Sequence, residues 1–256
     1  MLADLVAGAV ADARDREQRR PLSAVERAAR DATPALDVLG ALAPADRVKI
    51  IAEVKRASPS RGSLAEIPDP ALLARSYQSG GASAISVLTE QRRFNGSLSD
   101  LEAVRAAVTV PVLRKDFVAE PYQVFEARAA GADIVLLIVA ALDQPTLRSL
   151  AALVAELGMT ALVETHSAEE LDRALEIGAT LVGVNARNLT TFELDRDLFG
   201  RLADRIPDGV IRVAESAVLS AADVAHYRAD GADVVLVGEA LVTNDPAATL
   251  EQFLAV

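Results

Sequence analysis

The chain has 256 residues, 51 % of which are hydrophobic, and its formal net charge is −11. This acidic balance argues against nucleic acid and anionic membranes as main partners, and the absence of cysteine excludes disulfides, thiol catalysis and cysteine metal sites. The N-terminus lacks the order of a signal peptide and no apolar run reaches membrane-spanning length, so we expect a soluble cytoplasmic protein.

The first part of the chain predicts a helical extension, residues 1–46, because its acidic residues come early and its arginines late in the opening segment, as a helix dipole favours. From about residue 47, short apolar runs alternate with amphipathic segments. Eight of these runs are typical of parallel strands buried on both faces. They cover residues 48–55, 84–90, 110–116, 133–140, 160–166, 181–187, 210–216 and 233–239.

Helix signals fill the segments between these strands. We expect N-caps at Asp69, Ser97, Asp143, Ser167, Ser220 and Asp245. A short repeat (GGASAISVL, AGADIVLLI, IGATLVGVN, DGADVVLVG) places glycine where a helix ends in the left-handed conformation. The alternation predicts an α/β protein with a (β/α)8 TIM barrel, and the missing GxGxxG after the first strand weakens the Rossmann alternative. Residues 1–256 would form a single barrel domain that includes the extension.

Polar groups stand at most of the predicted strand ends, which form the active face of such a barrel. In chain order they are Glu53 and Lys55, Glu90, Lys115, Glu164, Asn185 and Arg187, Glu215 and Ser216, and Glu239 after Gly238. Any one of them can be a simple salt bridge at a strand end. The whole ring instead indicates a site whose opposite charges offset part of one another's desolvation.

Lysine is rare in this chain, because only three of the 26 Lys and Arg residues are lysines. Two of them, Lys55 and Lys115, stand at strand ends. Lysine can exchange a proton once its pKa shifts, whereas arginine effectively cannot. These two lysines therefore predict proton transfer, with ordinary charged strand ends as the alternative.

Other residues at the same face indicate an anion and an apolar ring as ligand groups. Hydroxyls and backbone amides after strands one, seven and eight suit a phosphate: Ser58, Ser216, Ala217, Gly238 and Glu239. The segment RASPSRGSL has the composition of a loop that closes over an anion. Phe94, Phe117 and Leu136 can form an apolar wall, although core packing is the commoner fate of such residues. Neither histidine fits catalysis well, and we expect no metal and no cofactor.

These motifs, in this order, resemble the indole-3-glycerol-phosphate synthase family of tryptophan biosynthesis. The resemblance runs from about residue 30 onward through AEVKRASPSRG, SVLTEQRRFNGSL, PVLRKDF, GADIVLLIVAAL, ALVETH, GVNARNLTTFELD, VAES and LVGEALV. It implies a carbon–carbon lyase that acts on 1-(2-carboxyphenylamino)-1-deoxyribulose 5-phosphate. The products would be indole-3-glycerol phosphate, carbon dioxide and water.

The resemblance also implies a role for each matching position. Lys115 would be the general acid at the ribulose carbonyl, and Lys55 would hold the substrate carboxylate and help in ring closure or dehydration. Glu164 and Glu53 would transfer protons and position the lysines. The matching ligand-binding positions are Asn185, Arg187, Phe94, Phe117, Leu136 and Leu189 for the substrate, and Ser58, Ser216, Ala217, Gly238 and Glu239 for its phosphate. The only partner implied is this phosphosugar–anthranilate, bound by a monomer or homodimer.

One position departs from the family pattern, since Ala217 stands where the family usually has glycine after the serine of strand seven. An alanine held at positive φ would cost about 1 kcal/mol or more, so we expect weakened phosphate binding or a rotated peptide. The carboxylate of Glu239 must also point away from a phosphate. A Schiff-base aldolase with Lys115 as nucleophile and a non-catalytic phosphosugar-binding barrel stay open, whereas an isomerase that needs a cysteine does not fit.

Overall fold

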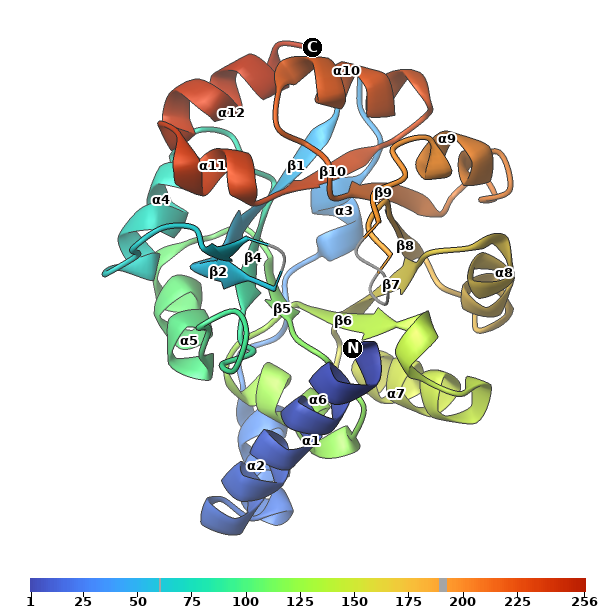
Figure 1. Cartoon of the computed structure of the whole chain (residues 1–256). Coiled ribbons are helices and arrows are strands. Elements are labelled where there is room, and N and C mark those ends of the chain that lie inside the picture. Colours follow the sequence, from blue (N-terminus) through green and yellow to red (C-terminus); the bar gives the residue numbers. More distant parts are fainter. Residues whose placement is uncertain (60, 189–192) are drawn as a thin grey trace.

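Eight parallel strands close into a barrel in the computed structural model, which describes residues 1–59, 61–188 and 193–256. The strands follow one another around the barrel as β1-β10-β9-β8-β7-β6-β5-β4, and helices surround them (Figure 1). Their bounds are β1 Lys49–Val54, β4 Ala84–Leu88, β5 Val112–Lys115, β6 Ile134–Ile138, β7 Thr160–Thr165, β8 Leu181–Asn185, β9 Ile211–Glu215 and β10 Val234–Val237. The predicted TIM barrel is therefore confirmed, and each strand is at most two residues shorter at either end than its apolar run.

The helices with predicted N-caps also begin where the sequence predicts. They are α1 Leu2–Arg19, α2 Leu22–Asp31, α3 Val38–Leu42, α4 Pro70–Ser79, α5 Leu98–Ala107, α6 Pro121–Ala129, α7 Gln144–Glu156, α8 Ala168–Glu176, α9 Leu198–Ala203, α10 Ala221–Ala229, α11 Glu239–Thr243 and α12 Pro246–Leu254, with a 3-10 turn η1 at Val139–Ala141. Each of the predicted N-cap side chains accepts a hydrogen bond from a backbone N–H in the first turn of its helix. The repeated glycines 81, 131, 178 and 231 have φ between 76° and 97°, the left-handed conformation that their places require.

The buried apolar residues form an outer layer and an inner layer. The outer layer fills the space between strands and helices, and every residue of β4, β6, β8 and β10 is buried. The inner layer lies inside the barrel and includes Ile51, Leu113, Leu162 and Val213. Parallel strands covered on both faces explain why their sequences are almost continuously apolar.

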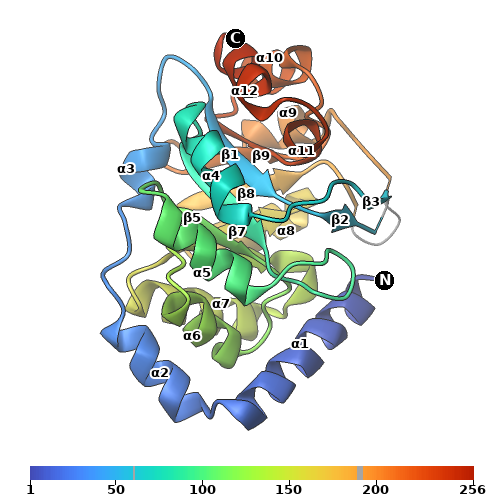
Figure 2. The same cartoon turned by 90° about the vertical axis from the view of Figure 1, so that its left-hand side faces the viewer.

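The N-terminal helices cover both ends of the barrel. Figure 2 shows α3 at one end and the first turn of α1 at the opposite end, on the same side as the short hairpin β2 (Ala57–Ser58) and β3 (Gly62–Ser63). Leu5 of α1 and Leu42 of α3 belong to the inner apolar layer. The segment that follows β1 thus forms an antiparallel hairpin at this rim. None of the described helices combines the length and the apolar character that crossing a membrane requires.

Candidate active site

A cavity of about 250 Å³ lies at the carboxyl ends of the barrel strands. It brings together every predicted catalytic and ligand-binding residue that the structure describes: Glu53, Lys55, Ser58, Phe94, Lys115, Phe117, Leu136, Glu164, Asn185, Arg187, Ser216, Ala217, Gly238 and Glu239. Glu90 of the predicted strand-end ring does not line this cavity, because its carboxylate accepts from the backbone N–H groups of Arg93 and Phe94. Leu189 lies outside the described residues. The polar residues at the predicted strand ends thus indicated where the cavity lies, because parallel strands present their carboxyl ends at one face.

Lys115 lies at the centre of the charged groups in this cavity. Its Nζ is 3.4 Å from Glu164 Oε2 and 3.4 Å from Glu215 Oε2. Burial alone would lower the pKa of Lys115, but Glu164, Glu215 and Glu53 outweigh it and raise that pKa above its usual value. The surrounding carboxyl groups therefore favour the charged ammonium form of Lys115.

A second lysine–carboxylate pair lies on β1. Lys55 Nζ is 2.9 Å from Glu53 Oε1, and Ser86 Oγ of β4 donates to Glu53 Oε2 at 3.2 Å. Burial would raise the pKa of Glu53, but the charges of Lys55 and Lys115 lower it below its usual value. Gly238 leaves room for this pair, because a Cβ there would lie 2.7 Å from Glu53 Oε1.

Asn185 connects the proton-transfer groups with the rim of the cavity. Its Nδ2 donates to Glu164 Oε1 at 3.2 Å, while its Oδ1 accepts from Ser216 Oγ at 2.7 Å and from the backbone N–H of Arg187 at 3.0 Å. The amide therefore fixes one oxygen of Glu164 and the hydroxyl of Ser216. The Glu164 carboxylate is thus held in one orientation, as a general base requires.

Glu215 is a site residue to which sequence reasoning assigned no role, although it ends a strand. Both of its carboxylate oxygens are buried, and neither has a hydrogen-bond partner among the described residues. Burial, together with the negative charge of Glu164, raises the pKa of Glu215 to about 8. Gly183 of β8 provides the space for this carboxyl group. The pKa values of the two carboxyl groups around Lys115 thus shift in opposite directions, that of Glu164 downward and that of Glu215 upward.

Apolar side chains form a wall of the same cavity. The rings of Phe94 and Phe117 are 6.2 Å apart between centroids and tilted by 44°. Leu136 of β6 and Leu5 of α1 also line the cavity. Such a wall suits a flat aromatic ring, and the contribution of α1 was not legible from sequence.

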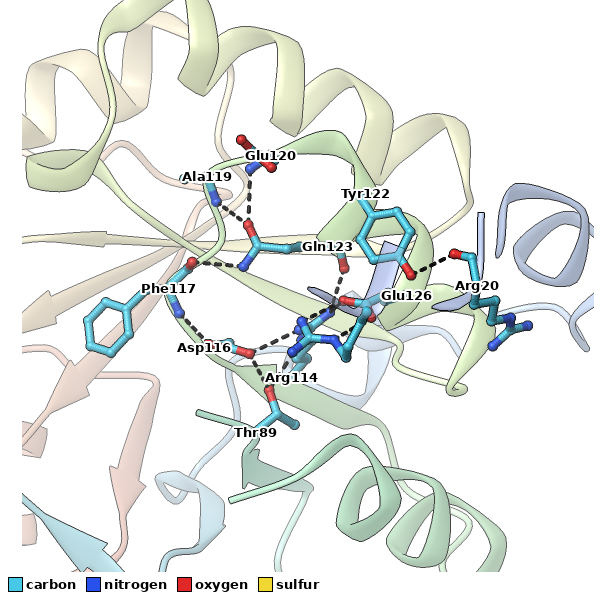
Figure 3. A network of polar contacts seen from close by, with 11 residues as sticks. Arg20, Thr89, Arg114, Asp116, Phe117, Ala119, Glu120, Tyr122, Gln123 and Glu126 are labelled. Carbon is cyan, nitrogen blue, oxygen red and sulfur yellow. Dashed lines mark hydrogen bonds and ion pairs between the residues drawn. The ribbon is translucent and has the colours of Figure 1, made fainter. Parts of the chain in front are cut away.

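A buried polar network behind β5 holds Phe117 in place (Figure 3). The fully buried Arg114 donates to the Gln123 carbonyl at 2.6 Å and to Asp116 Oδ2 at 2.9 Å. Asp116 Oδ1 accepts from the Phe117 N–H at 2.8 Å, and Gln123 Nε2 donates to the Phe117 carbonyl at 3.0 Å. Because successive side chains of a strand point to opposite faces, Arg114 anchors this network while Lys115 enters the cavity.

The same network reaches the N-terminal helix. Glu126 of α6 lies 3.5 Å from Arg114 Nη1, and its two oxygens accept from Arg16 of α1 at 2.6 and 2.8 Å. The side chain of Glu126 is 6 % exposed, so it is a desolvated carboxylate between two guanidinium groups. Helix α1 is thereby tied to the strand that carries Lys115.

The rim beyond Asn185 has an unusual backbone. Ser216 and Ala217 have φ values of 69° and 59°, so both are in the left-handed region. The positive φ expected of a glycine is therefore present at Ala217 in spite of its Cβ. Glu239 Oε1 forms an ion pair with Arg61 Nη2 at 2.7 Å. The charge of Glu239 is therefore directed toward the Arg61 side chain. Among the described residues, no group of His, Asp and Glu side chains has the arrangement of a metal site.

Acid–base groups at the carboxyl ends of a closed (β/α)8 barrel, beside an apolar wall, define a barrel enzyme. Comparison of the sequence with family models gives a match over residues 2–253 to the family described as indole-3-glycerol phosphate synthase. The chain belongs to this family of carboxy-lyases, which confirms the resemblance seen in the sequence.

Two curated relatives illustrate the similarity. The indole-3-glycerol phosphate synthase of Leifsonia xyli subsp. xyli is 73 % identical over 256 residues, which cover all of this chain and 98 % of that protein. The protein of the same name from Mycolicibacterium vanbaalenii is 60 % identical over 247 residues, covering 96 % of this chain and 90 % of the relative.

Solved structures support the fold alone. 3-Hexulose-6-phosphate synthase from Salmonella typhimurium is 17 % identical, with a TM-score of 0.67 over 81 % of this chain and 97 % of that one. N-acetylmannosamine-6-phosphate 2-epimerase from Clostridium perfringens is 14 % identical, with a TM-score of 0.63 over 81 % and 92 % of the two chains. At such low identity, the shared barrel carries no conclusion about the reaction.

Proposed function

We propose that this chain converts 1-(2-carboxyphenylamino)-1-deoxyribulose 5-phosphate to indole-3-glycerol phosphate, with Lys115 as general acid and Glu164 as base. Family membership supports the reaction. The position of Lys115 between two carboxyl groups in the cavity is the observation that carries the assignment of roles. The proposed catalytic set is completed by Lys55, Glu53, Asn185 and Ser216.

The first step joins the ring carbon that bears the carboxylate to the ketone carbon of the sugar chain. The ketone oxygen gains negative charge as this bond forms, and an alkoxide is basic enough to take a proton from an ammonium group. Lys115 supplies that proton. A donor held in its charged form by neighbouring carboxylates is loaded at neutral pH and transfers only when the oxygen becomes basic.

The later steps remove carbon dioxide and water. Carbon dioxide leaves from the same ring carbon, and the electrons of the broken bond restore the aromatic ring. The new hydroxyl then leaves as water with a proton from Lys55, while Glu164 takes a proton from the adjacent methylene carbon and the indole double bond forms. Two protons are given and one is taken, which equals the net uptake of one proton when a carboxylate leaves as carbon dioxide.

Glu215 gives the site a proton store. Its carboxyl group is protonated below about pH 8 and lies 3.4 Å from Lys115 Nζ, so it can return a proton to the lysine after the first step. Glu53 holds Lys55 at 2.9 Å. These placements support a division of labour in which each lysine has its own carboxyl partner.

The proposed binding mode places the three parts of the substrate along the cavity. The aromatic ring would lie against Phe94, Phe117 and Leu136, with Leu189 as a further expected contact outside the described residues. Arg187 and Lys55 would hold the carboxylate. The phosphate would meet Ser58, Ser216 and the amides of Ala217, Gly238 and Glu239, which supplies binding energy to hold the flexible sugar chain in a reactive conformation.

The direct test is product identification. Purified protein mixed with the substrate is expected to release carbon dioxide and to form a product with the mass and fluorescence of indole-3-glycerol phosphate. Binding of a reduced substrate analogue without turnover would favour a non-catalytic barrel instead. Borohydride trapping of a Lys115 adduct with a carbonyl substrate would favour an aldolase.

We further propose that the enzyme works in the cytoplasm, as a monomer or a homodimer, on this small molecule alone. A single chain supplies the charged groups and the apolar wall of the cavity, which supports a site that needs no second subunit. The acidic, cysteine-free composition supports the location.

A further inference from the structure

His166 lies directly behind the proposed base and belongs to none of the proposed catalytic groups. It follows β7, and its side chain is only 8 % exposed. Its Nε2 is 3.3 Å from Glu164 Oε1, and its Nδ1 is 3.1 Å from Glu170 Oε2 of α8. The backbone N–H of His166 also donates to Glu170 Oε2 at 2.8 Å, which fixes the position of that carboxylate.

The ring of His166 is enclosed by acceptors on both sides. Ionised carboxylates only accept hydrogen bonds, so a neutral imidazole would turn the lone pair of one nitrogen toward a negative charge. An imidazolium donates from Nδ1 to Glu170 and holds its positive charge 3.3 Å from Glu164 Oε1, although Nε2 makes no hydrogen bond to that oxygen. Burial would lower the pKa of His166, but the contacts with Glu164 and Glu170 outweigh burial and raise that pKa to about 10.

Strand β7, which precedes this ring, packs against β6, β8, η1, α7 and α8. In α7, Arg148 pairs with Glu176 and Glu156 pairs with Arg30. Strands β6 and β8 and the turn η1 contain no titratable side chain. Arg173 of α8 is directed elsewhere, because it donates to the carbonyls of Val139 and Leu142. Within the described part of the chain, Glu164, Glu170 and, beyond Glu164, Lys115 are therefore the charged groups that bear on His166.

The two carboxyl groups that share Lys115 have unequal surroundings. Glu164 contacts Lys115, the amide of Asn185 and the ring of His166. Glu215 contacts Lys115 but has no hydrogen-bond partner among the described residues. Two carboxyl groups this close do not both ionise readily, so the better supported one takes the negative charge.

We propose that His166 is a positioning residue whose imidazolium keeps Glu164 ionised and leaves the shared proton on Glu215. The inference rests on the proposed function, because it explains which carboxyl group is the base and which is the proton store. His166 acts through Glu164 and does not touch the reacting atoms. Its role is to give Glu164 and Glu215, which have the same chemistry, different protonation states.

The pH dependence of kcat/KM in variants tests this role. His166→Gln keeps a polar side chain beside Glu164 but removes the positive charge, so ionisation of the carboxyl pair becomes harder. We expect both limbs of the pH profile to move to higher pH by about one unit. Glu170→Gln, which removes the second carboxylate, is expected to move them in the same direction by less.

The second histidine provides the matched control. His226 is 43 % exposed on α10 and lies far along the chain from the site, near Asp197 and Asp230. His226→Gln should leave both limbs of the profile in place. If His166→Gln lowers kcat/KM equally at every pH while wild-type protein is active, His166 has only a structural role and the inference is wrong.

A spectroscopic measurement separates the inference from the proposed function. The chain contains two histidines, so a nitrogen-15 spectrum of the imidazole groups has two sets of signals, and the His226→Gln variant assigns them. We expect the His166 ring to carry protons on both nitrogens near pH 8. A His166 ring that is neutral at that pH would overturn the inference, whereas absence of turnover in the wild type would overturn the proposed function.

Discussion

Gly183 of β8 leaves open the space that the Glu215 carboxyl group of β9 occupies, since a Cβ on Gly183 would lie 2.1 Å from Glu215 Oε1. Gly183 is also the register partner of Glu164 on β7. The two carboxyl groups therefore approach each other across a strand position that has no side chain. This glycine serves a close approach of functional groups and has no need of a special backbone angle.

Gly183→Ala is expected to displace Glu215 from Lys115. A misplacement of about 1 Å can cost about 100-fold in rate, so kcat/KM should fall by that order while the barrel stays folded. Gly8→Ala is the control, because its nearest neighbour is the flexible Arg92 side chain at 3.2 Å. Steady-state kinetics with circular dichroism would check this. Equal activity of the two variants would contradict the role of the space at Gly183.

The pH dependence of the wild type follows from the raised pKa of Glu215. Below about pH 8 this group is protonated, and the charges of Lys115 and Glu164 cancel. Above that pH, Glu215 ionises and adds a negative charge that repels the carboxylate and the phosphate of the substrate. We expect kcat/KM to fall as pH rises through about 8, as a property of the coupled carboxyl pair.

The Glu215→Gln variant tests whether Glu215 is the group whose ionisation lowers kcat/KM. Glutamine keeps the shape of the neutral carboxyl group and cannot ionise, so the fall above about pH 8 should disappear while the overall rate is lower. The measurement is a profile of kcat/KM for both proteins. A wild-type profile that stays flat from neutral pH to about pH 10 would argue against a protonated Glu215.

Ala217→Gly should strengthen phosphate binding. At φ 59° an alanine carries strain of about 1 kcal/mol, which glycine does not. Freed from this strain, the amide can turn toward the phosphate, and KM should fall by up to about fivefold. Inhibition by inorganic phosphate should strengthen in parallel. An unchanged KM would show that the strained peptide does not limit binding.

Arg114→Met tests the buried network behind β5. It would leave Asp116 without its guanidinium partner and Glu126 with Arg16 alone, and loss of one partner of a buried ion pair costs about 3–5 kcal/mol. Arg148→Met removes an exposed pair with Glu176 and should change the free energy of unfolding by no more than about 1 kcal/mol. Urea unfolding compares the two. A similar small effect in both variants would mean that the network adds little to the free energy of unfolding.

The strands and caps were predictable from sequence because each has a local physical cause. Apolar runs mark strands buried on both faces, and side chains such as Asp69 and Ser97 bind the free N–H groups of the first helical turn. The positions of Lys115 and Glu164 at the active face followed from the rule that parallel strands end at one face.

Contacts between side chains of different elements could not be predicted in the same way. The approach of Glu215 to Glu164 depends on the register across β8 and on the absence of a side chain at Gly183. The ion pair between Arg16 and Glu126 joins residues 110 positions apart. His166 looked unsuited to a role because its two carboxylate neighbours become visible only when β7 and α8 are placed together.

The central claim is that Lys115 is the acid of ring closure, and single-turnover kinetics with Lys115→Met and Lys115→Arg tests it most directly. Formation of indole-3-glycerol phosphate, followed by fluorescence, should slow by about 100-fold or more in both variants, because methionine has no proton to give and arginine does not release one. A Lys115→Arg variant with nearly wild-type rate would contradict the account, since positive charge alone would then suffice.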